Sequence, residues 1–586
     1  MENSLKRNGP PPHIWIPGIV DGISRFLPAN EISGTLRFVD KATKHLFADK
    51  VILRLSRPVR PHLFAQCWGS PDAFNALSHK QRLEVVCLTA ASGSIVNLRV
   101  ALDNAGLLPT AELLEAAAKA GQLEACELLR ERGCPWGDSL ASAAEGGHRH
   151  VCEWMLASGC PRVWGAVFAA ARGGHEGLMI WLLDLVHSKG DDPDDLIQEE
   201  FLLEHAAAGL GLEALKRMHH QVMAERQTHL EQQQEQEDEG QQEHADEEQT
   251  EVEDEEEDEE QAEEEDEEED EEEDEEEEEG EEEGWGFDVR YLAAAAGSLT
   301  PDWQAKVEWL EGLGYPRCAD ASISAANVGP AGNAVGRLQW LHGRGYPMEY
   351  AATSSAENGD SAALQFLLEQ AGVSTRNINC PRVALKGHLD ILQYLRARAM
   401  TFNAVEVARS AASGGHLHVV AWAVETLGVT PDNTGDLLDR AATSGNIELM
   451  SWLRDRGWSW DHQAVANAAT CGRMEALDWI LAQGGHLPNN SWPYWDAAQN
   501  HDLAMLRRLH QLGCPWGPQL LEYFIFHSVP VPILRLLVEL GCPVDCGNVA
   551  ARVASGIHSG EYRTAVLEWL DELPPPPQQQ HQQNKK

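Results

Sequence analysis

A frame of about 28 residues recurs along this chain and constrains its fold more than any other feature. Each copy contains a turn and then a helical pattern with apolar residues at i, i+3, i+4 and i+7, as in GGHLHVVAWAVETLG from Gly414. We expect glycines or their equivalents to close the copies at 106, 133, 159, 190, 314, 345, 372, 399, 428, 457, 485, 513 and 541. A two-helix copy must bury its apolar face against a neighbour, so the pattern predicts a solenoid.

The stretch GGHRHVCEWMLASGCP (146–161) raises the question of a zinc site, because two histidines and two cysteines lie close together. The other copies replace Cys152 by Cys126, Met179, Leu392, Val420, Met450 and Leu477, which is the variation of a core position. Residues two apart on a helix point about 200° apart, so His148 and His150 are poorly placed to share a metal ion. We therefore expect neither a metal site nor another cofactor in the protein.

Each copy reads as two short helices joined by a glycine turn. The first is rich in alanine, as in DSLASAAEGG (138–147), and alanines let helices approach closely. The second carries a large apolar residue once per copy, including Trp154, Trp422 and Trp479. Two interpretations of this aromatic stripe are a ligand platform and the core between repeats, and the helical spacing favours the core.

The frame A-A-x-x-G-H-L-x-x-V/I-x-x-L/W-L-x-x-G resembles the ankyrin repeat, with matching Gly-His pairs at Gly147, Gly174, Gly387 and Gly415. The resemblance covers residues 83–225 and 286–572. The copies are shorter than the usual 33 residues and lack the Thr-Pro-Leu-His start of the first helix, which puts the geometry of the ankyrin finger in doubt. The resemblance implies an all-α fold, an ankyrin-type solenoid of helical pairs interrupted by a disordered acidic insertion.

The acidic insertion is predicted at 226–285. Residues 231–284 contain 38 of the 94 Asp and Glu and no Lys or Arg, so the net charge of −49 falls to −11 without them. Many like charges cannot bury a core, so this segment is expected to be disordered. It is interpreted as a solvating spacer or as a docking strip for a basic protein. The same charge leads us to expect no direct binding of nucleic acid.

The N-terminal residues break the repeat pattern. The pairs and triplets Ile16-Pro17, Phe26-Leu27-Pro28 and Leu36-Arg37-Phe38-Val39 resemble an F-box, here assigned to 13–55, although the late tryptophan of that motif is absent. The resemblance implies that Ile16, Pro17, Leu27, Leu36 and Val39 dock the adaptor subunit of a cullin-type ubiquitin ligase. The alternative is a helical cap on the first repeat of a plain scaffold. Residues 1–12 and the Pro/Gln-rich 573–586 are expected to be disordered.

No catalytic signature of the H-E-x-x-H, G-x-S-x-G or kinase type occurs, and we predict no catalytic residues. The expected function is therefore noncatalytic binding of other proteins of unknown identity. Tryptophan is common among binding hot spots, so Trp136, Trp164, Trp460 and Trp516 are candidate protein-binding residues, with packing onto the next repeat as the alternative. The sequence shows no signal peptide and no apolar run of membrane-spanning length, so we expect an intracellular protein, cytoplasmic or nuclear, without a membrane partner.

Overall fold

The computed structural model describes residues 29–34, 43, 45, 47, 52–161, 163–187, 195–224, 226–228, 289–460, 463–517, 519–544 and 560–573. These residues form α-helices and short 3-10 helices, and a single isolated β-bridge pairs Leu107 with Asp502. The all-α, helical-repeat prediction is therefore confirmed for this part of the chain. The predicted segments 1–12, 226–285 and 573–586 lie outside the described residues, except for 226–228 and 573.

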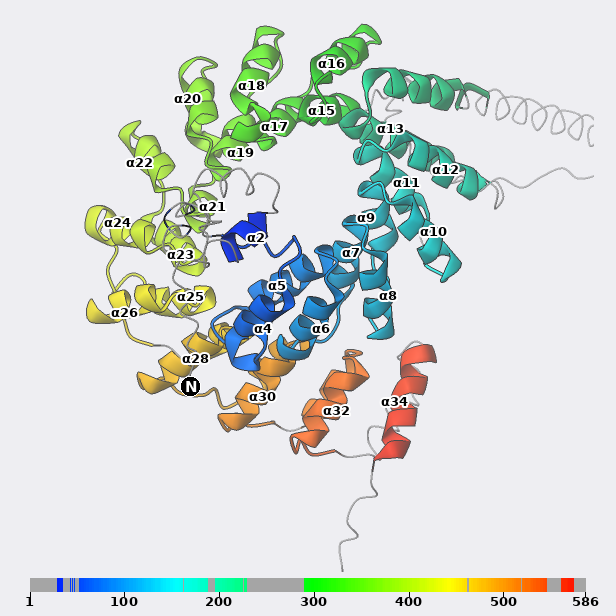
Figure 1. Cartoon of the computed structure of the whole chain (residues 1–586). Helices are drawn as coiled ribbons and strands as arrows, with labels where there is room; N and C mark the ends of the chain where they lie inside the picture. Colours follow the sequence, from blue (N-terminus) through cyan, green and yellow to red (C-terminus); the bar gives the residue numbers. More distant parts are fainter. Residues whose placement is uncertain are drawn as a thin grey trace, which may run out of the picture. The chain divides into compact units, whose positions relative to one another are not determined.

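Helical pairs follow one another along the chain as the repeat predicts (Figure 1). The first helices are α5 (His79–Ala91), α7 (Ala111–Lys119), α9 (Ser139–Glu145), α11 (Val163–Arg172), α13 (Asp195–Gly209), α15 (Val289–Gly297), α17 (Ala319–Asn327), α19 (Ala351–Glu357), α21 (Cys380–Leu385), α23 (Ala404–Gly414), α25 (Leu437–Ser444), α27 (Gln463–Thr470), α29 (Trp492–Gln499) and α31 (Leu520–Phe526).

The second helices are α6 (Ile95–Asn104), α8 (Leu123–Glu131), α10 (Arg149–Ala157), α12 (Glu176–His187), the helix 212–224, α16 (Trp303–Gly312), α18 (Ala334–Gly343), α20 (Ser361–Glu369), α22 (Leu389–Ala397), α24 (Leu417–Leu427), α26 (Ile447–Asp455), α28 (Met474–Ala482), α30 (Leu503–Gln511) and α32 (Val531–Glu539). The remaining elements are α2 (Ala29–Gly34), α4 (Pro61–Trp68), η2 (Pro71–Phe74), η3 (Pro330–Gly332), η4 (Thr375–Asn377) and α34 (Gly560–Glu572).

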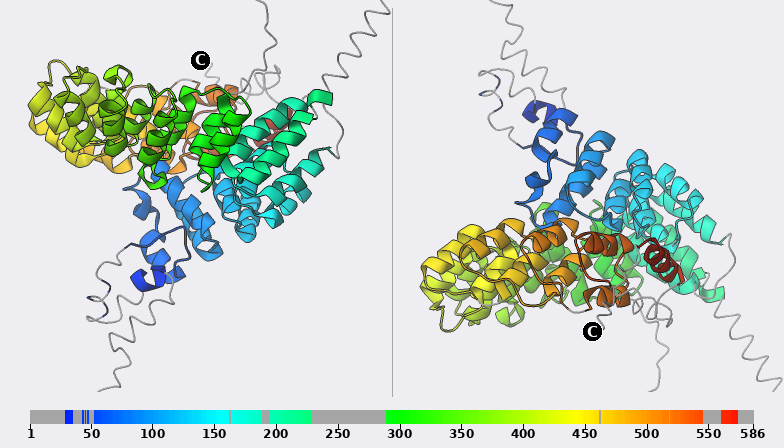
Figure 2. Two further views of the ribbon diagram at one scale, coloured as in Figure 1. Left: turned by 90° about the horizontal axis from the view of Figure 1, so that it is seen from above. Right: turned by 90° about the horizontal axis from the view of Figure 1, so that it is seen from below.

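Alanine and cysteine side chains occupy the positions that the repeat assigns to the core. Ala143 and Ala144 of α9 are fully buried, and first helices pack on first helices, α7 against α9 and α23 against α25. Cys126 and Cys152 are also fully buried in their second helices. The core assignment of the Cys152 position is thus confirmed. Figure 2 shows the yellow and orange helices, from α23 to α32, side by side.

Glycine closes most of the second helices, as predicted. A left-handed residue after a helix lets its amide bond to the carbonyls of the last turn, and glycine adopts this conformation without a steric penalty. Gly133, for example, has a φ of 84° after α8. Two positions differ in detail: Gly484 rather than the expected Gly485 adopts the positive φ, and Ala399 takes it at 60° where glycine is absent.

The chain folds into two compact units, which differ from the two predicted repeat blocks 83–225 and 286–572. Unit 1 comprises residues 1–162, 356–361 and 378–586, and unit 2 comprises residues 163–355 and 362–377. The sequence places the acidic insertion between blocks, whereas the helices that flank residues 229–288 both belong to unit 2.

Polar contacts join the modules on either side of residues 229–288. The Asp302 carboxylate accepts a hydrogen bond from the Leu212 amide at 2.7 Å, and the Ser298 hydroxyl donates to the Ala208 carbonyl at 2.7 Å. The buried Lys306 ammonium donates to the Ala207 carbonyl at 2.9 Å, and burial lowers its pKa to about 8. The helical stack of unit 2 is therefore continuous across the insertion.

Replacing residues 229–288 with a Gly/Ser linker of about 15 residues is expected to leave the fold of unit 2 intact. A fourfold shorter loop stabilises the flanking modules by about 1 kcal/mol through its lower closure entropy. Urea unfolding followed by circular dichroism measures this difference. A destabilisation of about 2 kcal/mol or more would show that the segment itself contributes to folding.

Within unit 1, residues 78–108 contact residues 471–508, which are about 400 positions later in the sequence. The Arg82 guanidinium donates through Nη1 to Asp502 Oδ1 at 3.0 Å and through Nη2 to Asp502 Oδ2, and both side chains are completely buried. Backbone bonds extend the contact, from the Leu108 amide to the His501 carbonyl and from the Ala504 amide to the Gly106 carbonyl, each at 3.0 Å. We call this set of contacts the clasp.

Two glycines make the clasp sterically possible. A Cβ on Gly106 would lie 2.6 Å from the Cβ of Ala504, and one on Gly472 would lie 2.7 Å from the Cβ of His79. Both glycines also have positive φ, 64° and 65°. Side chains larger than hydrogen would therefore push the two stretches apart.

Candidate binding surface

An exposed cluster of aromatic side chains lies on two consecutive first helices, α29 and α31, in unit 1. Trp492, Tyr523 and Phe526 are 56%, 40% and 47% exposed, and they surround a hollow of about 470 Å³. We call this hollow the aromatic groove; its lining is Ser491, Trp492, Trp495, Gln519, Leu520, Tyr523 and Phe526. Contiguous exposed apolar surface of this kind is typical of interaction sites.

Helical spacing places these rings on one side of each helix. Trp492 and Trp495 are three residues apart in α29, and Tyr523 and Phe526 are three apart in α31, so each pair shares a face. Pro493 starts α29 in its first turn, where its missing N–H costs no hydrogen bond. On the other side of α31, Leu521 and Phe524 are fully buried in the module core. The same packing that buries Leu521 and Phe524 therefore turns the neighbouring rings outward.

Trp495 lies at the centre of the cluster and is held by its neighbours. Its ring centroid is 4.8 Å from that of Tyr523 and 4.8 Å from that of His527, both in edge-to-face arrangement. Tyr523 and His527 are themselves 4.5 Å apart. These distances fall in the favourable range for aromatic pairs. The Trp495 and Tyr523 side of the groove is therefore ordered before a ligand binds, which lowers the entropy cost of binding there.

The sequence contains a signal for this groove, namely aromatic residues at positions where most first helices carry small ones. If the buried pair Ala497–Ala498 is aligned with Ala468–Ala469 of the preceding module, Trp495 corresponds to Ala466. The first helices elsewhere are rich in alanine, whereas α29 reads WPYWDAAQ and α31 reads LLEYFIF. Large rings at positions that the frame gives to small residues therefore mark the site.

The four predicted tryptophans are half-buried and lie apart from the groove lining. Trp136 packs edge-on against Trp154 at 5.9 Å, and Trp460 packs likewise against Trp479 at 5.7 Å. Trp516 stacks on Tyr494 at 4.4 Å, and Trp164 contacts Phe168 at 5.7 Å. Trp136 and Trp460 thus join a link to the following second helix, which is the packing role weighed against binding. Their role in binding a partner stays a prediction.

Arginine side chains also contact two of these tryptophans, Trp136 and Trp460. The guanidinium of Arg130 lies 4.0 Å from the centroid of Trp136, and that of Arg454 lies 5.2 Å from the centroid of Trp460. Such contacts are attractive because a cation meets the negative face of the ring. Each of these two rings therefore has one face covered by a cation.

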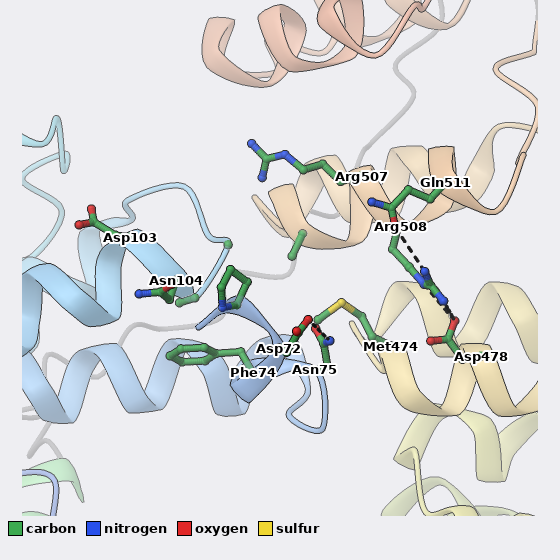
Figure 3. A pocket seen from close by; sticks show the side chains of 14 residues that line it. Asp72, Phe74, Asn75, Asp103, Asn104, Met474, Asp478, Arg507, Arg508 and Gln511 are labelled. Carbon is green, nitrogen blue, oxygen red and sulfur yellow. Dashed lines mark hydrogen bonds and ion pairs between the residues drawn. The ribbon is translucent and has the colours of Figure 1, made fainter. Parts of the chain in front are cut away.

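A second hollow, of about 520 Å³, lies beside the clasp (Figure 3). It is lined from segments 71–75, 103–106, 474–478 and 504–511. Figure 3 shows Arg508 turned toward Asp478, and its Nη2 lies 2.6 Å from Asp478 Oδ1. Side chains of both charges and amides line this hollow without converging on one point, so it offers less selective chemistry than the aromatic groove.

The other predicted site residues lie outside the described residues. Ile16, Pro17, Leu27, Leu36 and Val39 belong to this group, so docking of a ligase adaptor stays a prediction. The described α2 is joined to the following segment by Asn30, whose amide donates to the Arg54 carbonyl at 2.8 Å and accepts from the Arg54 amide at 2.8 Å.

The histidines and cysteines of residues 146–161 play structural parts. His150 Nε2 lies 3.2 Å from the Gly121 carbonyl oxygen, and burial raises the pKa of the Cys152 thiol to about 12. Among the described residues, no three His, Cys, Asp or Glu side chains gather closely enough to hold a metal ion. No helix in this described part is both long and apolar enough to cross a membrane.

Comparisons with known proteins found similar chains among solved structures alone, and with low TM-scores. No family model and no curated protein matches the chain. Among solved structures, the chain is similar to the pentatricopeptide repeat protein PPR10 from maize, with a TM-score of 0.28 and 13% identity over 96% of this chain and 76% of that one. Two structures of PPR10 in complex with an 18-nt psaJ RNA element match with a TM-score of 0.24 and 11% identity, over 95% of this chain and 88% of theirs.

One prediction is corrected by these comparisons. The sequence analysis expected no direct binding of nucleic acid, whereas two of the similar helical-repeat structures contain RNA, so the exclusion is withdrawn. It relied on the negative charge of residues 231–284, and the physical error is that the remaining residues carry a net charge of only −11. The charge of one segment does not describe the surfaces of the helical modules.

Proposed function

We propose that this helical-repeat protein is a noncatalytic binding protein that holds a protein partner in the aromatic groove. The observation that carries the proposal is the exposure of Trp492, Tyr523 and Phe526 around one hollow. Tryptophan and tyrosine are the residues that most often dominate binding energy at protein interfaces. Leaving three such rings in water on a stable module is unfavourable unless a partner covers them.

Two finer parts of the proposal come from sequence resemblance. The modules are of the ankyrin type, which the Gly-His turns and the packing of first helices on first helices support. Residues 13–55 connect the protein to a cullin-type ubiquitin ligase, with a plain scaffold as the alternative. Retention of the ligase adaptor by the full chain, lost on Leu27→Asp, would support the ligase role.

Groove variants are expected to lose partners that the wild-type protein retains from a cell extract. Trp492→Ala and Phe526→Ala each remove an exposed ring, and loss of such an anchor weakens binding by about 2 kcal/mol, roughly thirtyfold. Quantitative affinity purification with mass spectrometry compares the proteins recovered with each variant. Because Trp492 and Phe526 are about half exposed, circular dichroism should show unchanged helicity.

Leu385→Ala provides the matched control for these variants. Leu385 is 45% exposed, close to the 47% of Phe526, but it lies on α21 outside the groove. The control should retain the partners that the groove variants lose. Identical recoveries from the wild type, the control and both groove variants would contradict a binding role for the groove.

A further inference from the structure

The polar side chains of the aromatic groove are the two indole donors of Trp492 and Trp495 and the groups of Ser491, Gln519 and Tyr523, which can both donate and accept. Among the described residues, the indole N–H groups of Trp492 and Trp495 and the hydroxyl of Tyr523 have no hydrogen-bond partner. An indole N–H can only donate. The lining also contains no Asp, Glu, Lys or Arg. The groove therefore suits an uncharged ligand that presents carbonyl oxygens next to apolar surface.

A proline-rich peptide has this chemistry. Proline has no backbone N–H, so a run of prolines offers carbonyl acceptors and apolar rings but no donors. The polyproline II helix is already extended and ordered, so binding it costs little conformational entropy. A charged peptide would instead leave its charges unpaired against these rings.

From these observations we infer that the aromatic groove binds a proline-rich peptide in the polyproline II conformation. This inference rests on the proposed function and names the class of partner. Single-stranded nucleic acid is the competing ligand, because bases also stack on aromatic side chains. The groove favours the peptide, since its lining has no Lys or Arg to neutralise phosphate.

The peptide acetyl-LPPPPQ-amide, which has the sequence of residues 573–578, is a suitable probe. Saturable binding to the full chain, measured by isothermal titration calorimetry, should weaken at least tenfold on Trp492→Ala and on Tyr523→Ala. It should be unchanged on Leu385→Ala. A matched peptide with serine in place of the four prolines should not bind.

The chain carries the same four prolines at 574–577, so they could compete with the probe. A variant with serine at 574–577 is therefore titrated in parallel, and groove-dependent binding to either form supports the inference. Failure of the probe to bind both forms overturns it, as does groove-dependent binding of an eight-nucleotide oligouridine in place of the peptide. If the probe fails while Trp492→Ala still loses protein partners, the proposed function stands and only the proline-rich class is rejected.

Discussion

Replacing Asp502 with asparagine is expected to lower the free energy of unfolding of unit 1 by about 3–5 kcal/mol, because it leaves the buried Arg82 cation without a counterion. Arg82 Nη1 also donates to the Ala105 carbonyl at 3.0 Å, but a neutral carbonyl does not compensate a full charge. Asparagine preserves the side-chain oxygen that accepts from the Met505 amide at 2.9 Å and caps α30. The predicted loss of unfolding free energy therefore measures the contribution of the ion pair and not that of the helix cap.

Urea unfolding followed by circular dichroism measures this loss, and hydrogen exchange of α5 and α6 locates it. The double variant Arg82→Met with Asp502→Asn should recover part of the stability, because it removes the uncompensated charge. Asp478→Asn is the exposed control: its pair with Arg508 is solvated, so we expect a change below about 1 kcal/mol. Equal effects of Asp502→Asn and Asp478→Asn would contradict a stabilising clasp.

Raising the pH above 9 is expected to destabilise the helical modules steeply, because several core thiols must ionise on unfolding. Burial raises the pKa of seven thiols from 9.0 to about 11 or 12, those of Cys87, Cys126, Cys134, Cys152, Cys380, Cys514 and Cys542. In the folded state they keep their protons where the unfolded chain has lost them. Their contribution to stability is therefore complete below pH 9 and is lost as the pH rises toward 12.

A thiol whose pKa is raised from 9.0 to about 12 costs about 1.4 kcal/mol at pH 10 relative to pH 7. Urea midpoints between pH 7 and 10.5 in a reducing buffer measure the sum of these costs. Cys152→Val is the matched variant, because Val420 occupies the corresponding position of another module. The loss of unfolding free energy between pH 7 and pH 10 should be smaller in this variant by the cost of one thiol, about 1.4 kcal/mol. A wild-type stability that stays constant up to pH 10 would show that these thiols are not buried as described.

Local patterns in the sequence predicted the modules because helix formation and burial repeat with the same period. The alanines of α9, the buried Cys152 of α10 and the left-handed Gly133 after α8 each follow from the frame. Their environment is supplied by the same or the adjacent module, so a short stretch of sequence contains the information.

The aromatic groove and the roles of the predicted tryptophans needed the positions of neighbouring modules. Trp136 and Trp495 are both large rings beside a helical pair, but Trp136 packs on Trp154 whereas Trp495 lies next to exposed rings of α31. Residue type alone does not separate these cases. The departure of α29 from the alanine-rich pattern was the available signal.

Local sequence patterns predicted that this chain forms paired helices, where glycine closes the pairs, and that the alanine and Cys152 positions are buried, because these properties depend on interactions over about 30 residues. The pairing of Arg82 with Asp502, and the exposure of Trp492 beside a half-buried Trp516, followed only from the tertiary arrangement. The reason is that burial of a charge or a ring depends on the surface brought against it, and that surface comes from distant or neighbouring modules whose identity no local pattern encodes.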